Sequence, residues 1–167
     1  MRAWIRKMLE TNAEDNQYAR VEAKAEEQEP LETQFPEDLF SLFNQQVTIL
    51  GQKLKGEMFI NVVRIWMNYL QDKLEEKAET FLKGASDGQV LRYVVEVNDF
   101  NKLALNLNDN KAEIVQYVEG DLVEKVNQCF IETAKVIGRG TEWLLQSYGA
   151  ETDVSGLRCY HESELVL

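Results

Sequence analysis

Apolar side chains recur every three or four residues over four long stretches of this chain, which is the spacing of an amphipathic helix. The first predicted helix covers 35–50, with a proline at its start and two acidic residues in its first turn, where they complement the helix dipole. The strongest pattern covers 57–81, and a third covers 90–107. The last stretch begins at 114 and ends at 148.

The apolar positions of these stretches form the predicted core. They are Leu39, Leu42, Phe43, Val47, Leu50, Phe59, Val62, Val63, Trp66, Leu70, Leu74, Phe81, Val90, Val94, Val97, Phe100, Ala104, Leu107, Ile114, Val118, Leu122, Val126, Cys129, Phe130, Thr133 and Ile137. The β-branched start of the third stretch is compatible with a strand, but its apolar face continues well beyond strand length, which favours a helix. The predicted fold is therefore all-α, an elongated antiparallel helical bundle.

Glycine, asparagine and aspartate mark the predicted ends of these helices. Gly51 and Gly56 are expected to separate the first helix from the second, and 84–88 is expected to form a short turn. The Asn-Asp-Asn run at 108–110 predicts another turn with a helix cap, and the Gly-Arg-Gly run at 138–140 predicts an interruption of the last helix.

The segments outside the bundle have a different composition. Residues 1–10 show helical spacing from the first residue without an N-cap, so they are interpreted as the end of a truncated helix. Residues 11–34 are strongly acidic with few large apolar side chains and are interpreted as a flexible acidic linker; a specific acidic binding motif is the alternative. The bundle is assigned to 35–148, and 149–167 is expected to be a frayed tail.

Length and charge restrict the classes of function. The 167 residues suit one domain, and 29 acidic against 18 basic side chains give a net charge of -11. This balance argues against binding nucleic acid or an anionic lipid surface, both of which need basic side chains. No apolar run reaches the length of a membrane span, and the N-terminus lacks the features of a secretory signal. Cys129 and Cys159 form no CxxC pair and are expected to be reduced thiols of a cytoplasmic protein.

Residue types that carry chemistry are present, but not in catalytic or metal-binding patterns. His161 is the single histidine and has no second ligand at metal spacing, and Cys129 lies on the apolar stripe and is expected to be packed. The run at 138–140 lacks the remainder of a phosphate-binding loop. The spacing of Asn106, Asn108 and Asn110 is that of a calcium loop, but Lys111 and Tyr117 replace the required glycine and glutamate. The carboxylates of Glu75, Glu76 and Glu79 are interpreted as part of a solvated helix face. The rings of Trp66 and Trp143 are interpreted as anchors in the core. No catalytic, cofactor-binding or metal residue is assigned.

Several segments occur in a distinctive order: AWIRKMLET, an acidic stretch, FPEDLFSLFNQQ, RIWMNYLQDKLEEKAETF, LRYVVEVNDFNKLALNL, VEKVNQCF and TEW. In this order and spacing the chain resembles the central region of the exocyst complex component 3 (Sec-six subunit) family. The resemblance extends from about Ala3 to Trp143 and rests on ordered helical patterns and a few aromatic residues. Members of the family are several times longer, so the resemblance implies a fragment.

The resemblance implies a rod segment of the multisubunit tethering-complex type with a non-catalytic scaffold role. Such a subunit helps to hold secretory vesicles at the plasma membrane before fusion, and its expected partners are other exocyst subunits and SNARE proteins. The implied location is cytoplasmic, peripheral at plasma-membrane sites of exocytosis, with no direct membrane insertion. The alternative is a stand-alone acidic helical bundle that binds a ligand or catalyses a reaction with carboxylates; an unrelated helical adaptor is a third possibility. An open apolar surface favours a scaffold, and a cavity with inward carboxylates favours the alternative.

Overall fold

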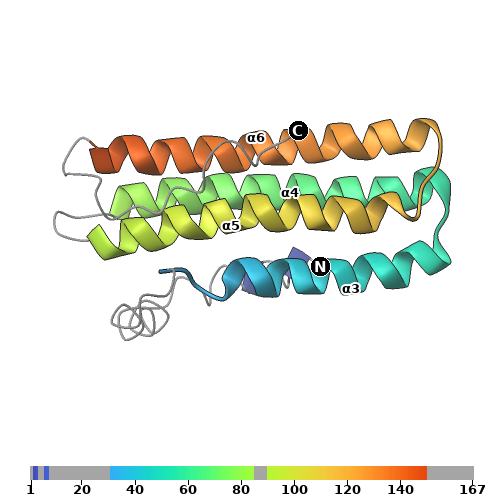
Figure 1. Ribbon diagram of the computed structural model, residues 1–167, viewed down its shortest axis with the longest axis horizontal. Helices are drawn as coiled ribbons and strands as arrows, with labels where there is room; N and C mark the ends of the chain where they lie inside the picture. Colours follow the sequence, from blue (N-terminus) through green and yellow to red (C-terminus); the bar gives the residue numbers. More distant parts are fainter. Residues whose placement is uncertain (1, 4–5, 8–30, 85–89, 150–167) are drawn as a thin grey trace.

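The computed structural model describes residues 2–3, 6–7, 31–84 and 90–149 (Figure 1). Within residues 31–149 as described, the secondary structure consists of four long helices and no strands. They are α3 (Phe35–Lys53), α4 (Gly56–Gly84), α5 (Val90–Val115) and α6 (Asp121–Gly149). The all-helical prediction is confirmed, including the helical interpretation of the β-branched stretch that became α5. The predicted turn at 84–88 begins at the last residue of α4, Gly84; the remainder of that turn, most of the acidic linker and the tail from 150 onward lie outside the described residues.

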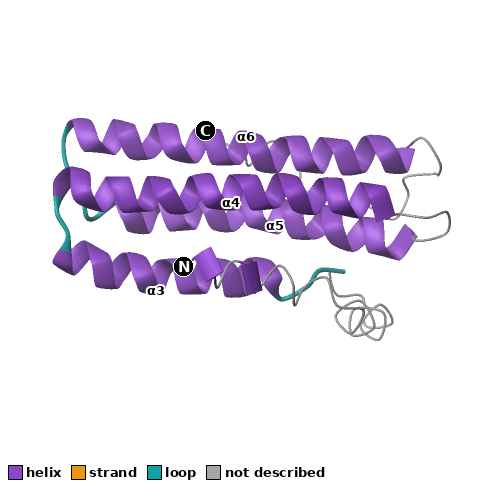
Figure 2. Cartoon of the chain, turned by 180° about the vertical axis from the view of Figure 1, so that it is seen from behind, coloured by secondary structure: helices purple, strands orange, loops and turns teal. Residues whose placement is uncertain are grey.

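The four helices form an elongated bundle in which successive helices alternate in direction (Figures 1 and 2). The helices packed most closely are not always successive ones, since α4 packs along α6, α6 along α5, and α5 along α3. As a result, α3 and α5 are parallel neighbours, as are α4 and α6. The backbones of α3 and α4 lie close over a short stretch only, and the two helices are joined by side chains of the common core.

Two glycines in the left-handed backbone region form the turns at one end of the bundle. Gly56 has a φ of 58° and follows the short Leu54–Lys55 connection between α3 and α4. Gly120 also has a φ of 58°, and it precedes α6. A side chain at either position would be strained in this conformation, so glycine is the natural residue there. The predicted helix break at Gly56 is confirmed.

A single large apolar cluster runs along the interior and joins all four helices. Most predicted core positions belong to it, and its fully buried members include Phe43, Phe59, Phe100 and Ile114. Eight positions differ from the prediction by degree: Val90 at the start of α5 is exposed, and seven are half-buried, namely Leu42, Leu50, Val62, Trp66, Phe81, Ala104 and Leu122. The half-buried members lie at the margins of each apolar stripe, as expected for a bundle whose helices each keep one face in water.

The predicted turn at 108–110 is wrong, because α5 continues through it to Val115. Asn110 is fully buried, and its side-chain amide donates a hydrogen bond of 2.6 Å to Asn44 Oδ1 on α3. This polar contact between parallel helices gives Asn110 a role inside the helix. The turn lies later, at residues 116–120.

The predicted interruptions at Gly51 and at 138–140 are also wrong, because α3 and α6 pass through these glycines. Gly140 faces the ring of Phe100 on α5, and Gly51 faces the ring of Tyr117, so closely that an added Cβ would overlap each ring. These two glycines therefore create room for aromatic side chains of a neighbouring segment. Gly138, in contrast, has open space around it.

Candidate functional site

The first half of α5 carries three buried polar side chains: Glu96, Asn98 and Asp99. They alternate with Val95, Val97 and Phe100, which are also buried, so nearly the whole circumference of this part of α5 is enclosed. A buried polar group is stable only when it has hydrogen-bond partners. The partners come from α4 and from the extended residues before α3.

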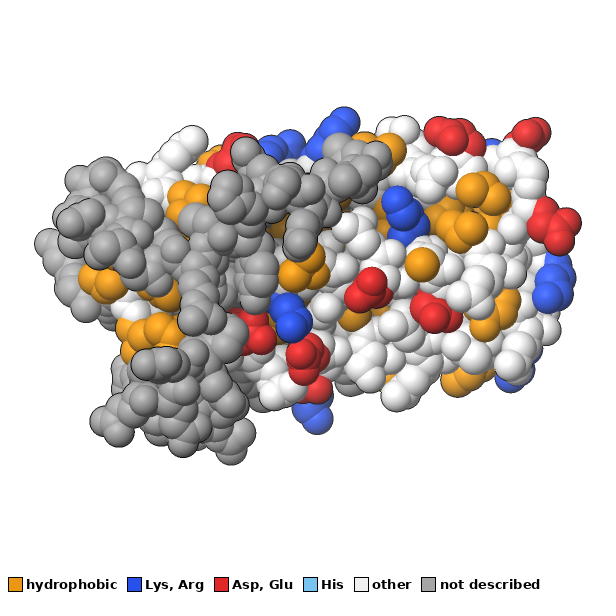
Figure 3. Space-filling model, in the orientation of Figure 1, with side chains coloured by type: hydrophobic (Ala, Val, Ile, Leu, Met, Phe, Trp, Pro, Cys, Tyr) orange, Lys and Arg blue, Asp and Glu red, His pale blue; other side chains and the backbone are white. Residues whose placement is uncertain are grey.

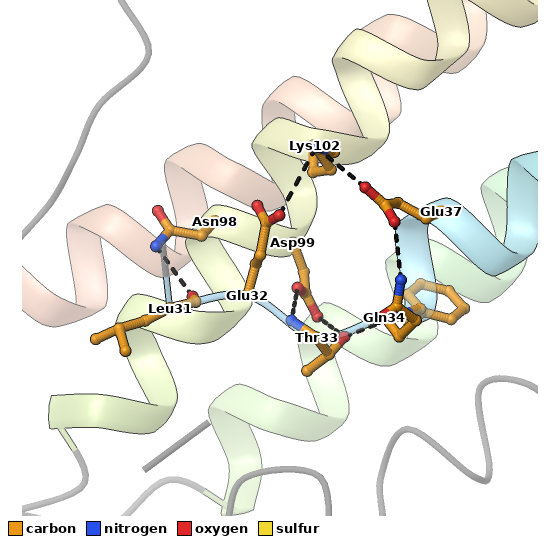
Figure 4. A network of polar contacts seen from close by, with 9 residues as sticks. Leu31, Glu32, Thr33, Gln34, Glu37, Asn98, Asp99 and Lys102 are labelled. Carbon is orange, nitrogen blue, oxygen red and sulfur yellow. Dashed lines mark hydrogen bonds and ion pairs between the residues drawn. The ribbon is translucent and has the colours of Figure 1, made fainter. Parts of the chain in front are cut away.

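Residues 31–34 lie along α5 and are held there by hydrogen bonds (Figure 4). Asp99 accepts two of them from Thr33: the backbone N–H donates to Oδ1 at 2.7 Å, and the hydroxyl donates to Oδ2 at 2.6 Å. The Asn98 amide donates to the Leu31 carbonyl at 3.0 Å, and Leu31 packs on Val95. We call residues 31–34 the docked segment. Within the predicted linker at 11–34, these last residues are ordered by α5.

Lys102 lies one turn beyond Asp99 on α5 and links the docked segment to α3 (Figure 4). Its ammonium group is 3.7 Å from Glu32 Oε1 and 3.4 Å from Glu37 Oε1. Glu37 also accepts a hydrogen bond of 2.8 Å from the Gln34 side chain. These partly exposed contacts are individually weak, but together they fix the entry of the chain into α3.

The electrostatics of the cluster come from two carboxylates and one ammonium group. Glu96 is buried and forms an ion pair with Lys77 of α4. Burial, and after it the charge of Glu96, raise the pKa of Asp99, whereas Lys77 and the Thr33 hydrogen bonds lower it; together they bring the pKa to about 7. Asp99 is thus a carboxyl group whose proton is retained up to near-neutral pH.

A pKa near 7 is the value that suits proton transfer, so Asp99 is the residue to weigh for acid–base chemistry. Its side chain has 0% exposure, and both its oxygens already bind Thr33. In this conformation a reactant has no path to it. The geometry suits a clasp that attaches the docked segment to α5.

A second feature is the set of exposed apolar side chains on α3 and α4. In the described part of the chain the exposed large hydrophobic side chains are Ile49, Met58, Ile65 and Val90. Met58 and Ile65 are seven residues apart on one face of α4, and Tyr69 continues that face one turn later. Ile49 lies in the last turns of α3, opposite the start of α4 across the short connection. We call Ile49, Met58, Ile65 and Tyr69 the α3–α4 edge.

The orientation of α4 follows from its contacts on each side. Gln71 donates a hydrogen bond of 2.8 Å to Thr133 Oγ1 of α6, and Glu75 pairs with Arg139 of α6 at 2.5 Å. On the opposite side, the ring of Trp66 packs edge-on against Phe43 of α3, with centroids 5.8 Å apart. Helical spacing places the α3–α4 edge beyond Trp66 on the α3 side, away from α6.

The N-terminal residues lie at one end of this edge. Residues 2–3 and 6–7 are helical, and the guanidinium carbon of Arg2 lies 5.7 Å from the centre of the Tyr69 ring, within the range of a cation–π interaction. The pKa of Glu76 is lowered chiefly by its hydrogen bond to Lys73, and the charge of Arg6 contributes to the same shift. Arg2 thus lies near Tyr69, and Arg6 lies near Glu76, about two turns further along α4.

The residues considered as functional candidates in the sequence lie at separate positions in the structure. Cys129 is buried, and burial raises the pKa of its thiol to about 11, so the packed-thiol prediction is confirmed. Glu76 pairs with Lys73, and Glu79 pairs with Lys83 at 3.1 Å, each along the surface of α4. Trp66 and Trp143 pack against the core from partly buried positions. His161 and Cys159 lie outside the described residues.

The polar cluster on α5 was not identified from the sequence. The available signal was the run VVEVNDF, in which three polar residues lie among apolar ones. A helix face in contact with water would carry fewer β-branched residues beside its polar ones. Their partners lie in other segments of the chain: Thr33 binds Asp99, and Lys77 binds Glu96. No feature of the sequence around Thr33 or Lys77 identifies either residue as a partner. Helical spacing alone therefore gave no reason to join them.

The surface drawn in Figure 3 mixes acidic, basic and apolar side chains in small groups over the described residues. Over the described ranges, no three His, Cys, Asp or Glu side chains converge as a metal site would require. None of the helices in that part of the chain combines the length and apolar character needed to span a bilayer. Comparison with protein-family models, curated proteins and solved structures finds no match to the chain.

Proposed function

We propose that the chain is a non-catalytic helical segment of an exocyst-type tethering subunit. The observation that carries the proposal is the α3–α4 edge, where an elongated helical bundle leaves apolar side chains exposed on one side. Exposed apolar side chains grouped on one side of a molecule commonly mark a protein-binding surface. The kind of complex is inferred from the resemblance of the chain, in the order of its segments, to the exocyst complex component 3 family.

The mechanism is structural. The helices bury one face in the common core and thereby hold the remaining faces at fixed positions for partner helices. The partners in this proposal are other exocyst subunits and SNARE proteins, and the location is cytoplasmic, at plasma-membrane sites of exocytosis. The polar cluster on α5 contributes by fixing residues 31–34 along α5, which sets their path into α3.

The test is binding to purified exocyst subunits, one at a time, measured by biolayer interferometry with the full chain immobilised. Saturable binding to at least one subunit with a Kd in the range of about 1 µM or tighter is the expected result. The Leu70→Asp variant is the control, because Leu70 is fully buried and a charge there destroys the fold while the chain stays acidic. No saturable binding, or equal binding by Leu70→Asp, contradicts the proposal.

The second candidate is a ligand-binding protein or enzyme that uses buried carboxylates. One observation favours it: Asp99, whose pKa is raised to about 7, lies beside Glu96 in the interior. Against it, these groups bind Thr33 and Lys77 within the chain. The two candidates differ in the effect of Asp99→Asn, which abolishes acid–base chemistry but leaves the α3–α4 edge and its partner binding intact.

A further inference from the structure

The charges around the buried part of α5 do not balance when both of its carboxyl groups are ionised. Glu96 and Asp99 are both buried and lie three residues apart on α5. Lys77 of α4 forms its ion pair with Glu96, and in the part of the chain that the structure describes Asp99 forms no ion pair. A buried carboxylate without a counter-ion is costly, so the enclosed form of Asp99 is the neutral acid.

The contact between Asp99 and Thr33 is compatible with this neutral form. The Thr33 N–H, 2.7 Å from Oδ1, needs only an acceptor oxygen there. The 2.6 Å between Oδ2 and the Thr33 hydroxyl suits a hydrogen bond with the proton on either oxygen, because a hydroxyl both donates and accepts. Loss of the Asp99 proton therefore leaves the same neighbours in place but adds a second negative charge beside Glu96, where water does not reach it.

Charged groups near Asp99 come from every element packed around this part of α5. After burial itself, the charge of Glu96 raises the pKa of Asp99, and the charge of Lys77 lowers it. The others are Lys102 on α5, Glu32 on the docked segment, Glu37 on α3, and Arg139 and Glu142 on either side of Gly140, where α6 faces Phe100. Lys102 contacts Glu32 and Glu37, and Arg139 pairs with Glu75 of α4. Of these acidic groups, Asp99 is the one that binds the docked segment through both of its oxygens.

The docked segment lies against α5 outside the main core. Leu31 and Val95 form a small apolar cluster of their own, separate from the large one. The chain enters the large cluster at Phe35, which is 2% exposed. The contact of Glu32 with Lys102 is partly exposed and therefore weak. Residues 31–33 can thus leave α5 by rotation at Gln34 while Phe35 and the four helices stay packed.

We propose that the docked segment is a pH-sensitive strap, which lies on α5 while Asp99 carries its proton and lifts about Gln34 when Asp99 loses it. Lifting gives the carboxylate access to water and uncovers Val95 and Asn98 on the same part of α5 (Figure 4). This inference is independent of the tethering proposal, because it uses only contacts and charges within the chain.

The direction of the switch follows from the pKa of Asp99 in the two states. The pKa is about 7 with the segment docked, whereas the ordinary value for an aspartate in water is 3.8. Between these values lifting releases a proton, so its equilibrium constant rises with pH, by at most about tenfold per pH unit. Above about pH 7 both states are ionised and the constant becomes level. The strap is therefore closed on the acidic side of this range.

The test is hydrogen exchange of the Thr33 backbone N–H, which Asp99 accepts directly. NMR on the full chain measures its rate at several pH values, and division by the intrinsic exchange rate at each pH gives the protection. The expected result is a fall in Thr33 protection by about tenfold or more between about pH 5 and pH 7.5. The N–H of Met67, which is fully buried in α4, is expected to stay at least about a hundredfold more protected throughout, because it requires a larger opening.

Two variants identify the group that titrates. Asp99→Asn still accepts the Thr33 N–H but cannot ionise, so its Thr33 protection is expected to be independent of pH. Glu32→Gln removes the titratable side chain of the docked segment itself, and the pH dependence is expected to remain. Unchanged circular dichroism shows that both variants fold.

Three outcomes overturn the inference. The first is a wild-type Thr33 protection that does not change across this pH range. The second is a pH dependence that persists in Asp99→Asn or disappears in Glu32→Gln, since either assigns the switch to another group. The third is equal protection of Thr33 and Met67, which means that the segment leaves α5 only when the whole bundle unfolds.

Discussion

Thr33 donates two hydrogen bonds to Asp99, from its backbone N–H at 2.7 Å and from its hydroxyl at 2.6 Å. The two residues are 66 positions apart in the sequence. This contact attaches the docked segment to α5 and sets the path of the chain into α3. It also places a carboxyl group where water does not reach it.

Removal of the Asp99 carboxyl group is expected to loosen the docked segment. Asp99→Ala leaves the Thr33 N–H and hydroxyl without their acceptor, and the expected loss in the free energy of unfolding is about 1–3 kcal/mol. Asp99→Asn keeps an acceptor for the N–H and is expected to lose less. Urea unfolding followed by circular dichroism measures both, and an equal loss for the two variants contradicts the assigned contact.

The raised pKa of Asp99 makes stability depend on pH with a definite sign. The folded pKa, about 7, lies above the ordinary carboxyl value of 3.8, so the folded state binds the proton more tightly than the unfolded state does. The contribution of this group is therefore fully present below pH 3.8 and is lost as pH rises through about 7.

The measurement is the difference between wild type and Asp99→Asn in free energy of unfolding across this range. The wild type is expected to lose stability relative to the variant, with a limiting slope of about 1.4 kcal/mol per pH unit. The comparison with Asp99→Asn isolates the change at this position, because the two proteins are otherwise identical. A difference that grows with pH in the opposite direction contradicts the assignment.

The ion pair between Lys77 and Glu96 is expected to show strong coupling. Lys77→Met removes the lysine while Glu96 stays buried, and the expected loss in the free energy of unfolding is about 3–5 kcal/mol. The double variant Lys77→Met/Glu96→Gln is expected to be more stable than Lys77→Met alone, because the buried charge is gone. Chemical unfolding of the wild type, both single variants and the double variant gives the coupling energy. Additive losses are the contrary result.

Two glycines of α6 provide a matched pair. Gly138 has open space around it, so Gly138→Ala is expected to stabilise the helix by about 0.5–1 kcal/mol. At Gly140 an added methyl group meets the ring of Phe100, and Gly140→Ala is expected to lower stability by about 1–3 kcal/mol despite its better helix propensity. Thermal unfolding of the two variants tests this; a gain for Gly140→Ala would show that the ring lies elsewhere.

The buried thiol of Cys129 is expected to be unreactive in the folded protein. Burial raises its pKa to about 11, so almost no thiolate is present at neutral pH. Alkylation with iodoacetamide, followed by peptide mass spectrometry, is expected to label the Cys129 peptide only when denaturant is added. Rapid labelling of this peptide in native buffer contradicts the packing of α6.

The sequence was sufficient to predict the four helices because each carries an apolar stripe longer than any strand, and the residues of that stripe became the core. It was misleading at Asn110 and Gly140. Asparagine and glycine are turn signals in a local reading, but here Asn44 and Phe100, on other helices, decide their roles. Local propensity cannot represent a partner that comes from a distant part of the chain.

The same reason explains why the candidate sites were not predicted. In the sequence, Asp99 cannot be distinguished from any other polar residue of an amphipathic helix, because its partner Thr33 belongs to another segment of the chain. The α3–α4 edge depends on α3 packing against α5 instead of closely against α4, which helical spacing leaves undetermined.

The most direct measurement is the affinity of the folded chain for reconstituted exocyst subunits, compared between wild type, Met58→Gln/Ile65→Gln and Val90→Gln. If this helical bundle acts by binding a partner through its open side, at least one subunit binds saturably, and the paired substitution weakens that binding by about tenfold while Val90→Gln does not. Absence of saturable binding to every subunit contradicts the tethering role, and binding that ignores the paired substitution contradicts the use of the α3–α4 edge.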